Sequence, residues 1–221
     1  MGSSFLSLFG DIERVVWKTA PGPAPSFNEA HVIMALELIG RQRSIGRIRL
    51  SKELGLGEGT TRTLLRHLIK EGIIQSSRSG ILFSEKGKQL YSELQSKLSE
   101  CLDVPKSPLT LGSCNVAVLV RDSAKVVVSG MEQRDLAIKS GASGATTLVF
   151  SDNKLSLPTG EENLSESMPE LHNKLVTHFN PKENDVIIVG CGENRVIAEI
   201  GAKMAAFKLS KKTTINRFPE N

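Results

Sequence analysis

The sequence predicts an α+β protein of two domains, a mainly helical domain followed by a domain in which strands and helices alternate. Up to about residue 104, apolar side chains recur at helical spacing, whereas beyond residue 109 short β-rich runs such as 116–120 alternate with helical stretches. Between the two patterns lies Pro105-Lys106-Ser107-Pro108, a break that favours a domain boundary. A chain of 221 residues has room for two modest domains.

The composition excludes several classes of function. Hydrophobic residues at 39% and charged residues at 24% are typical of a soluble globular protein, and aromatics at 5% are too few for binding single strands by base stacking. The three cysteines lack the paired spacing of a zinc site, so reduced thiols and no metal are expected. They are Cys101, Cys114 and Cys191. We find neither a membrane-length apolar run nor a secretory signal, and we expect a cytoplasmic protein without a cofactor.

Residues 1–25 combine an amphipathic helix with a stiff spacer. Apolar side chains recur at helical spacing over 3–18, and Pro21-Gly22-Pro23-Ala24-Pro25 ends any helix. The apolar residues are Phe5, Leu8, Phe9, Ile12, Val15 and Val16. This face can pack on its own protein or pair with a second subunit, and the sequence leaves both open.

Positive charge is concentrated in one segment. Residues 41–90 contain eleven Lys and Arg against four Glu, a net charge of +7, so that the rest of the chain sums to −3. A basic segment attached to a mildly acidic remainder indicates a domain that binds a polyanion.

Capping and turn residues within 26–104 predict a specific order of elements. Ser26 or Asn28 can cap the first helix, Gly55-Leu56-Gly57 makes a tight turn, and Gly72 ends the third helix. The predicted elements are a helix after 26, a bridge at 45–48, helices at 50–54 and 58–71, strands at 73–76 and 81–83, and a helix at 84–103.

The stretch IRLSKELGLGEGTTRTLLRHLIKEGIIQSSRSGILFSEKG resembles the winged helix-turn-helix domains of prokaryotic transcription regulators. The resemblance implies that the helix after the turn enters the major groove of double-stranded DNA and that the hairpin is the wing. The guanidinium groups suit guanine edges or phosphates, and the hydroxyls suit phosphates. The expected DNA-binding residues are Arg49, Ser51, Glu58, Thr60, Thr61, Arg62, Arg66 and Arg78.

Residues 109–210 predict an α/β sandwich with a mixed sheet, possibly ferredoxin-like. The predicted strands are 115–121, 146–150, 153–157 and 185–190, and the predicted helices are about 124–141, 168–179 and 193–208. The start of the first helix is uncertain because Val126-Val127-Val128 is β-branched and equally suits a strand.

Two polar spots in this domain can hold a ligand. In Val189-Gly190-Cys191-Gly192-Glu193, a strand runs through two glycines into a helix start, which suits either an anion or a plain tight turn. The second spot, after Gly130, is a polar cluster that can bind a small polar ligand or form an ordinary exposed helix face. The candidate ligand-binding residues are Gln133, Arg134, Asp135, Lys139, Gly190, Gly192, Asn194 and Arg195.

The phrases SGMEQRDLAIKSGASGATTLVF and DVIIVGCGENRVIAEIGAKMAAFKL resemble an archaeal family of uncharacterised winged-helix proteins. With the N-terminal match, the resemblance extends over most of residues 27–208 and implies a transcription regulator without catalytic residues.

The leading hypothesis is therefore a homodimeric, sequence-specific DNA-binding regulator whose C-terminal domain senses a small ligand, dimerises, or does both. One alternative is an enzyme fused to a DNA-binding module. It requires convergent His, acidic or Cys residues, whereas His172 and His178 are six residues apart and do not share a helix face. A second alternative is an architectural or interaction factor that senses nothing.

Overall fold

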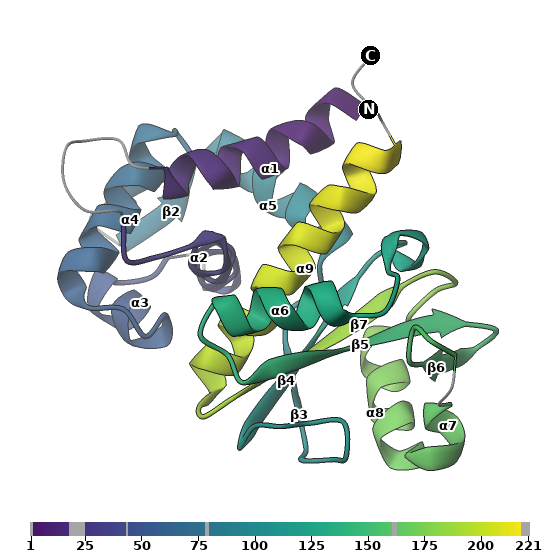
Figure 1. Cartoon of the computed structure of the whole chain (residues 1–221). Coiled ribbons are helices and arrows are strands. Elements are labelled where there is room, and N and C mark those ends of the chain that lie inside the picture. The colour runs from purple at the N-terminus through teal and green to yellow at the C-terminus, as the bar shows by residue number, and fades with distance from the viewer. Residues whose placement is uncertain (1, 18–24, 43, 78–79, 161–162, 218–221) are drawn as a thin grey trace. The chain divides into compact units, whose positions relative to one another are not determined.

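The computed structural model describes residues 2–17, 25–42, 44–77, 80–160 and 163–217, with side chains from residue 7 onward. It divides into two compact units, residues 1–95 and 96–221, which we describe one at a time. Figure 1 shows a helical N-terminal unit and a C-terminal unit built on one sheet, so the predicted α+β class is confirmed.

The N-terminal unit has the predicted order of helix, bridge, two helices, hairpin and helix, preceded by one further helix. Its elements are α1 (Gly2–Val16), α2 (Glu29–Arg41), α3 (Arg47–Glu53), α4 (Glu58–Lys70), β1 (Ile74–Ser77), β2 (Gly80–Phe83) and α5 (Glu85–Lys97).

Local signals set the ends of these helices. The Asn28 side chain accepts a hydrogen bond from the His31 amide and begins α2. Gly55, at φ +63°, makes the turn between α3 and α4, and Gly72, at φ +70°, follows α4. Because these positions favour glycine, the sequence specifies the helix-turn-helix locally.

The hairpin is held to the start of α3 by a bridge. β1 and β2 pair antiparallel from Ile74↔Phe83 to Ser77↔Gly80. Ile45 and Ile81 form an isolated β-bridge, in which each backbone amide donates to the carbonyl of the other residue. These backbone hydrogen bonds thus hold the hairpin in place beside α4.

Helix α1 packs on its own domain, which decides between the two alternatives left open by the sequence. It contacts α2 and α4, and its residues Leu8, Phe9, Ile12 and Val15 are buried. The ring of His67 on α4 lies 2.7 Å from the Val15 carbonyl oxygen through Nδ1.

The C-terminal unit contains a five-stranded sheet with helices between the strands. Its elements are β3 (Leu102–Val104), β4 (Cys114–Val120), the 3₁₀ helix η1 (Ala124–Val126), α6 (Met131–Lys139), β5 (Gly144–Ser151), β6 (Lys154–Ser156), α7 (Leu164–Ser167), α8 (Pro169–Phe179), β7 (Val186–Gly192) and α9 (Arg195–Arg217).

The sheet is antiparallel throughout, so the predicted mixed sheet is wrong. The strand order is β3-β4-β7-β5-β6, and every neighbouring pair is antiparallel. β4 and β5 run in the same direction, but they are not neighbours because β7 lies between them. Because the last strand is central rather than at an edge, the ferredoxin-like order is also absent.

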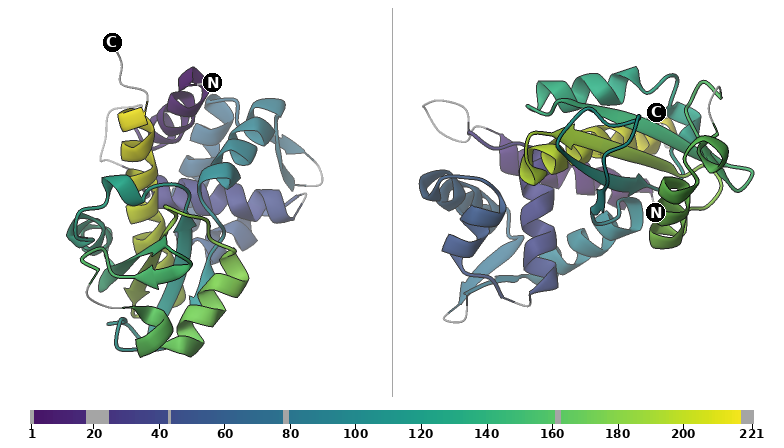
Figure 2. Two further views of the ribbon diagram at one scale, coloured as in Figure 1. Left: turned by 90° about the vertical axis from the view of Figure 1, so that its right-hand side faces the viewer. Right: turned by 90° about the horizontal axis from the view of Figure 1, so that it is seen from below.

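Helices cover both faces of this sheet. On one face α9 packs on β4 and β7, and α6 packs on β5 and α9. On the other face, apolar residues of α7 and α8 join a core with alternate sheet residues such as Leu119, Leu148 and Ile187. Figure 2 shows α6 and α8 on opposite sides of the sheet.

Two predicted helices end differently in the structure. The helix expected over 84–103 ends at Lys97, and Leu102–Val104 instead pairs with β4 as an edge strand. The helix expected over 124–141 is broken into η1 and α6, because Gly130 adopts φ +77° ahead of α6 and β-branched valines precede it. Long-range pairing and backbone conformation therefore override the helical spacing here.

Candidate functional site

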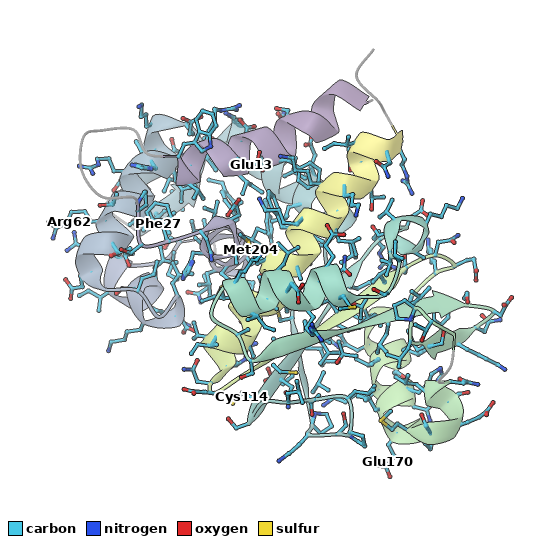
Figure 3. All side chains as sticks on the ribbon, in the orientation of Figure 1. Glu13, Phe27, Arg62, Cys114, Glu170 and Met204 are labelled. Atoms are coloured by element: carbon cyan, nitrogen blue, oxygen red, sulfur yellow. The ribbon has the colours of Figure 1, made fainter. Side chains whose placement is uncertain are left out.

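The exposed side of α4 carries the basic residues expected of a recognition helix. Arg62 and Arg66 are exposed, while Leu64, Leu65 and Leu68 on the opposite side are buried. Arg62 extends from the outer side of α4 in Figure 3. The 3.6-residue period thus separates a core face from a cationic face on one helix.

A hollow of about 370 Å³ lies between α4 and the hairpin. Three arginines line it, Arg47 from the start of α3 and Arg62 and Arg66 from α4. Its other walls are Ile45, Gly46, Leu65, Ile69, Ser76, Gly80 and Ile81. The Ile45–Ile81 bridge holds the hairpin wall against the start of α3, so the shape of the hollow is set by backbone pairing.

The cations of this hollow are not neutralised by neighbouring acids. Within the described ranges, no carboxylate forms an ion pair with Arg47, Arg62 or Arg66. By contrast, Arg49 lies 3.9 Å from the Glu53 carboxylate, and both side chains are exposed. Three unpaired guanidinium groups around one concave surface create a site for an anion.

The start of α4 adds backbone donors beside this surface. Its N-cap Gly57 supplies no side-chain cap, and the first helical hydrogen bond runs from the Thr61 amide to the Gly57 carbonyl. The amides of 58–60 therefore precede the helical ladder and favour negative charge. Open space surrounds the Cα atoms of Gly57 and Gly59, so another molecule can approach this backbone.

The structure places the eight expected DNA-binding residues in different settings. Arg62 and Arg66 meet at the hollow, Arg49 and Glu58 are exposed, and Thr60 is half-buried at the helix start. Arg78 lies outside the described residues.

Two of the expected residues are corrections. Thr61 is fully buried and its hydroxyl donates to the Gly57 carbonyl, while Ser51 is buried and its hydroxyl donates to the Leu56 carbonyl at 2.6 Å. Both hydroxyls stabilise the helix-turn-helix from within and do not face a partner. The core face of α4 therefore starts at Thr61, about one helical turn before Leu64.

Sequence reasoning missed Arg47 and the apolar residues around it. Arg47 is exposed at the hollow, and the large side chains of Ile48 and Ile69 are 58% and 49% exposed. The alternation Arg47-Ile48-Arg49 after Gly46 was a usable signal, because a short helix with one buried residue in its first turn must expose the others.

In the C-terminal unit, the Gly190-Cys191-Gly192 segment is not a ligand loop. All three residues are buried inside β7. A Cβ atom on Gly190 would lie 2.4 Å from the Ala198 carbonyl oxygen, and one on Gly192 would lie 2.7 Å from the Ala198 amide nitrogen. These glycines permit the close approach of β7 to α9, and the expected ligand contacts there are wrong.

The polar residues that follow are also used within the fold. The Asn194 side chain accepts a hydrogen bond from the Ile197 amide in the first turn of α9. Arg195 donates to Asp103 at 2.8 Å and to Glu199 at 2.5 Å. Both side chains thus have partners within the C-terminal unit.

The polar cluster on α6 is divided by its helix. Gln133 is buried, Lys139 is exposed, and Arg134 donates to the neighbouring Asp135 at 3.3 Å. Arg134 lines a hollow at the start of α6.

Among the described residues, no group of three or more His, Cys, Asp or Glu side chains could hold a metal ion, and none of the three cysteines forms a disulfide. No described helix is long and apolar enough to cross a membrane.

The two halves of the chain match two different family models. Residues 31–89 match the family model of PH0730-like N-terminal domains, and residues 111–209 match a domain of unknown function, DUF4443. One match therefore lies in each half of the chain, and each covers less than half of it.

A solved structure of hypothetical protein PH0730 from Pyrococcus horikoshii OT3 is similar to this chain. The two share 29% sequence identity with a TM-score of 0.71, over 87% of this chain and 99% of that chain. No curated protein matches the chain. These matches support the resemblance to an archaeal family and leave its winged-helix regulator role as a hypothesis.

Proposed function

We propose that this protein binds double-stranded DNA through α4 and the β1–β2 hairpin and acts as a sequence-specific transcription regulator. The observation that carries the proposal is the hollow between these elements, lined by three arginines without acidic partners in the described structure. Phosphates along a duplex are the polyanion that such an arrangement suits.

The dimensions of α4 support a role in the major groove. Its 13 residues correspond to about 20 Å at 1.5 Å per residue. A B-DNA major groove about 12 Å wide admits one helix. With the buried face of α4 packed on its domain, the face bearing Arg62 and Arg66 is left for base edges and phosphates.

The arginines have distinct parts in this proposal. The guanidinium forks of Arg62 and Arg66 can pair with O6 and N7 of guanine or with phosphate oxygens. Arg47 and the uncapped amides at the start of α4 suit the backbone phosphates that flank the groove. The proposed minor-groove or backbone contact by Arg78 at the hairpin tip stays part of the hypothesis.

We further propose that the protein works as a homodimer, because one recognition helix spans too few base pairs for useful specificity. The DUF4443 domain would sense a small ligand, dimerise, or do both, rather than catalyse a reaction. A ligand can regulate DNA binding only if it favours one arrangement of the protein over another.

The proposal is tested by selecting duplexes from a pool of random genomic fragments with the full chain at fixed salt and then sequencing them. We expect enrichment of a palindrome. Because a bidentate base contact contributes about 1–3 kcal/mol, Arg62→Ala with Arg66→Ala should weaken binding to that palindrome by roughly tenfold or more.

The matched control is Lys125→Gln with Lys154→Gln, which removes two exposed charges from the C-terminal unit. It should bind like the unmodified chain. Retention of no duplex at low salt, or equal weakening in both variants, would contradict the proposal.

A further inference from the structure

A second hollow, of about 230 Å³, lies in the C-terminal unit where α6 begins. Its polar wall includes Gly130, Arg134 and Thr147, and its apolar wall includes Met131, Leu157 and Pro158. It is smaller than the pockets of drug-sized ligands, which start at about 300 Å³. The hollow therefore suits a small metabolite that is polar at one end and apolar at the other.

The start of α6 supplies the polar wall with backbone N–H donors that have no helical acceptors. Gly130, the N-cap of α6, adopts a left-handed conformation and provides no side-chain cap. The first helical hydrogen bond runs from the Arg134 amide to the Gly130 carbonyl at 3.1 Å. The amides of 131–133 therefore lack helical acceptors and favour an anion in front of them.

Thr147 is a second, independent indication of a ligand. Its side chain on β5 is 3% exposed, and its hydroxyl has no hydrogen-bond partner among the described residues. Thr147 lines the hollow, and its Cβ and hydroxyl oxygen lie 3.1 and 3.2 Å from where a Cβ atom on Gly130 would be, so the hydroxyl lies beside the N-cap of α6. Buried hydroxyls almost always have a partner, and a bound molecule at this position would supply one.

Charges around the hollow also favour an anion. Among the described residues, the Arg134 guanidinium donates to the adjacent Asp135 carboxylate alone, at 3.3 and 3.4 Å, and its remaining N–H groups can donate to a ligand. The nearby Glu132 carboxylate is paired with the Lys212 ammonium at 2.6 Å and is thereby neutralised.

We propose that this hollow binds a small organic acid, with its carboxylate at the amides of α6, Arg134 and Thr147. Its short aliphatic part would lie against Met131, Leu157 and Pro158. A single arginine with one hydroxyl matches a carboxylate, and the apolar wall selects against a bare inorganic anion. The site is a property of the C-terminal unit alone and does not rest on DNA binding.

The experiment is an amide chemical-shift titration of the full chain, without DNA, using 4-methylpentanoate as the probe. The amides of 130–132 and of Thr147 should shift with a saturable curve. The neutral 4-methylpentanamide and inorganic phosphate, at the same concentrations, should bind at least about tenfold more weakly, because each lacks one half of the match.

Three variants separate a site from general electrostatics and from misfolding. Arg134→Gln should weaken 4-methylpentanoate binding about tenfold or more, whereas Lys139→Gln removes the same charge from the same helix outside the hollow and should leave it unchanged. Thr147→Val should weaken binding while the free protein melts at the same or a higher temperature, because an unpartnered hydroxyl is removed.

The proposal is overturned by the absence of saturable shifts in the unmodified chain, by equal binding of the amide or of phosphate, or by equal losses in the Arg134 and Lys139 variants. Since no DNA is present, each of these results leaves the proposed regulator role standing. Conversely, a chain that binds the acid but no duplex would refute only the DNA proposal.

Discussion

The three arginines of the hollow beside α4 allow a quantitative prediction about salt. Each arginine bound to a DNA phosphate releases condensed counterions and contributes about 0.9 to the slope of log affinity against log salt. If Arg47, Arg62 and Arg66 all contact phosphates, replacing them with Ala lowers the slope by about 2.7.

That difference is large over an ordinary range of salt. Between 50 and 200 mM, a change of about 2.7 in slope corresponds to roughly fortyfold in affinity. The triple variant should bind more weakly at 50 mM yet lose about fortyfold less affinity than the unmodified chain by 200 mM. All three side chains are exposed, so the substitutions should change stability by no more than about 0.5 kcal/mol each.

The assay is fluorescence anisotropy of a labelled duplex at five salt concentrations, with melting of each variant measured in parallel. The control replaces three exposed lysines of the C-terminal unit, Lys125, Lys139 and Lys154, with Gln. An unchanged slope in the arginine variant, or an equal change in the control, would refute the reasoning. A single arginine that alters affinity for one base but not the slope would instead be a base contact.

Three further predictions concern the fold. Burial lowers the pKa of His31 from 6.5 to about 4, so between these pH values the unfolded chain binds more protons than the folded chain. The free energy of unfolding should therefore fall by about 2 kcal/mol from pH 7 to pH 5. Urea titrations should show this loss, and His31→Gln should abolish it. Gly190→Ala should cost about 1–3 kcal/mol by pushing β7 from α9, whereas Gly59→Ala, in open space, should not lower the melting temperature. Asp185→Asn should cost about 2 kcal/mol in chemical unfolding, because this buried carboxylate accepts hydrogen bonds from Arg121 and from two backbone amides; an unchanged midpoint would contradict that role.

Much of the N-terminal unit could be predicted from sequence because its signals are local. The turn glycines and the leucine period of α4 predicted a helix over 58–71, and the structure has Glu58–Lys70. The hairpin followed from β-rich runs around a turn, and its strands were placed within one residue at each described end. Neighbouring residues decide caps, turns and amphipathic periods, so one chain segment is enough.

Predictions of exposure failed where one position of a helix decided the outcome. Thr61 is a polar residue and was expected to be exposed. Its position on the helix places it in the core, where its hydroxyl donates a hydrogen bond to the Gly57 carbonyl. Arg195 looked like a ligand contact, but Asp103, which lies far away in the sequence, comes within 2.8 Å of it. Only a tertiary contact of this kind shows whether a polar group already has a partner.

By itself the sequence determined that this is an α+β chain with a basic helix-turn-helix and hairpin ahead of a second domain. The tertiary structure decided that β7 inserts between β4 and β5, that the glycines of β7 serve its packing on α9, and that Arg47 joins Arg62 and Arg66 around one hollow. The physical reason is that strand neighbours and concave surfaces join residues far apart in the chain. No local propensity encodes such contacts, because they depend on how all the apolar faces are buried at once.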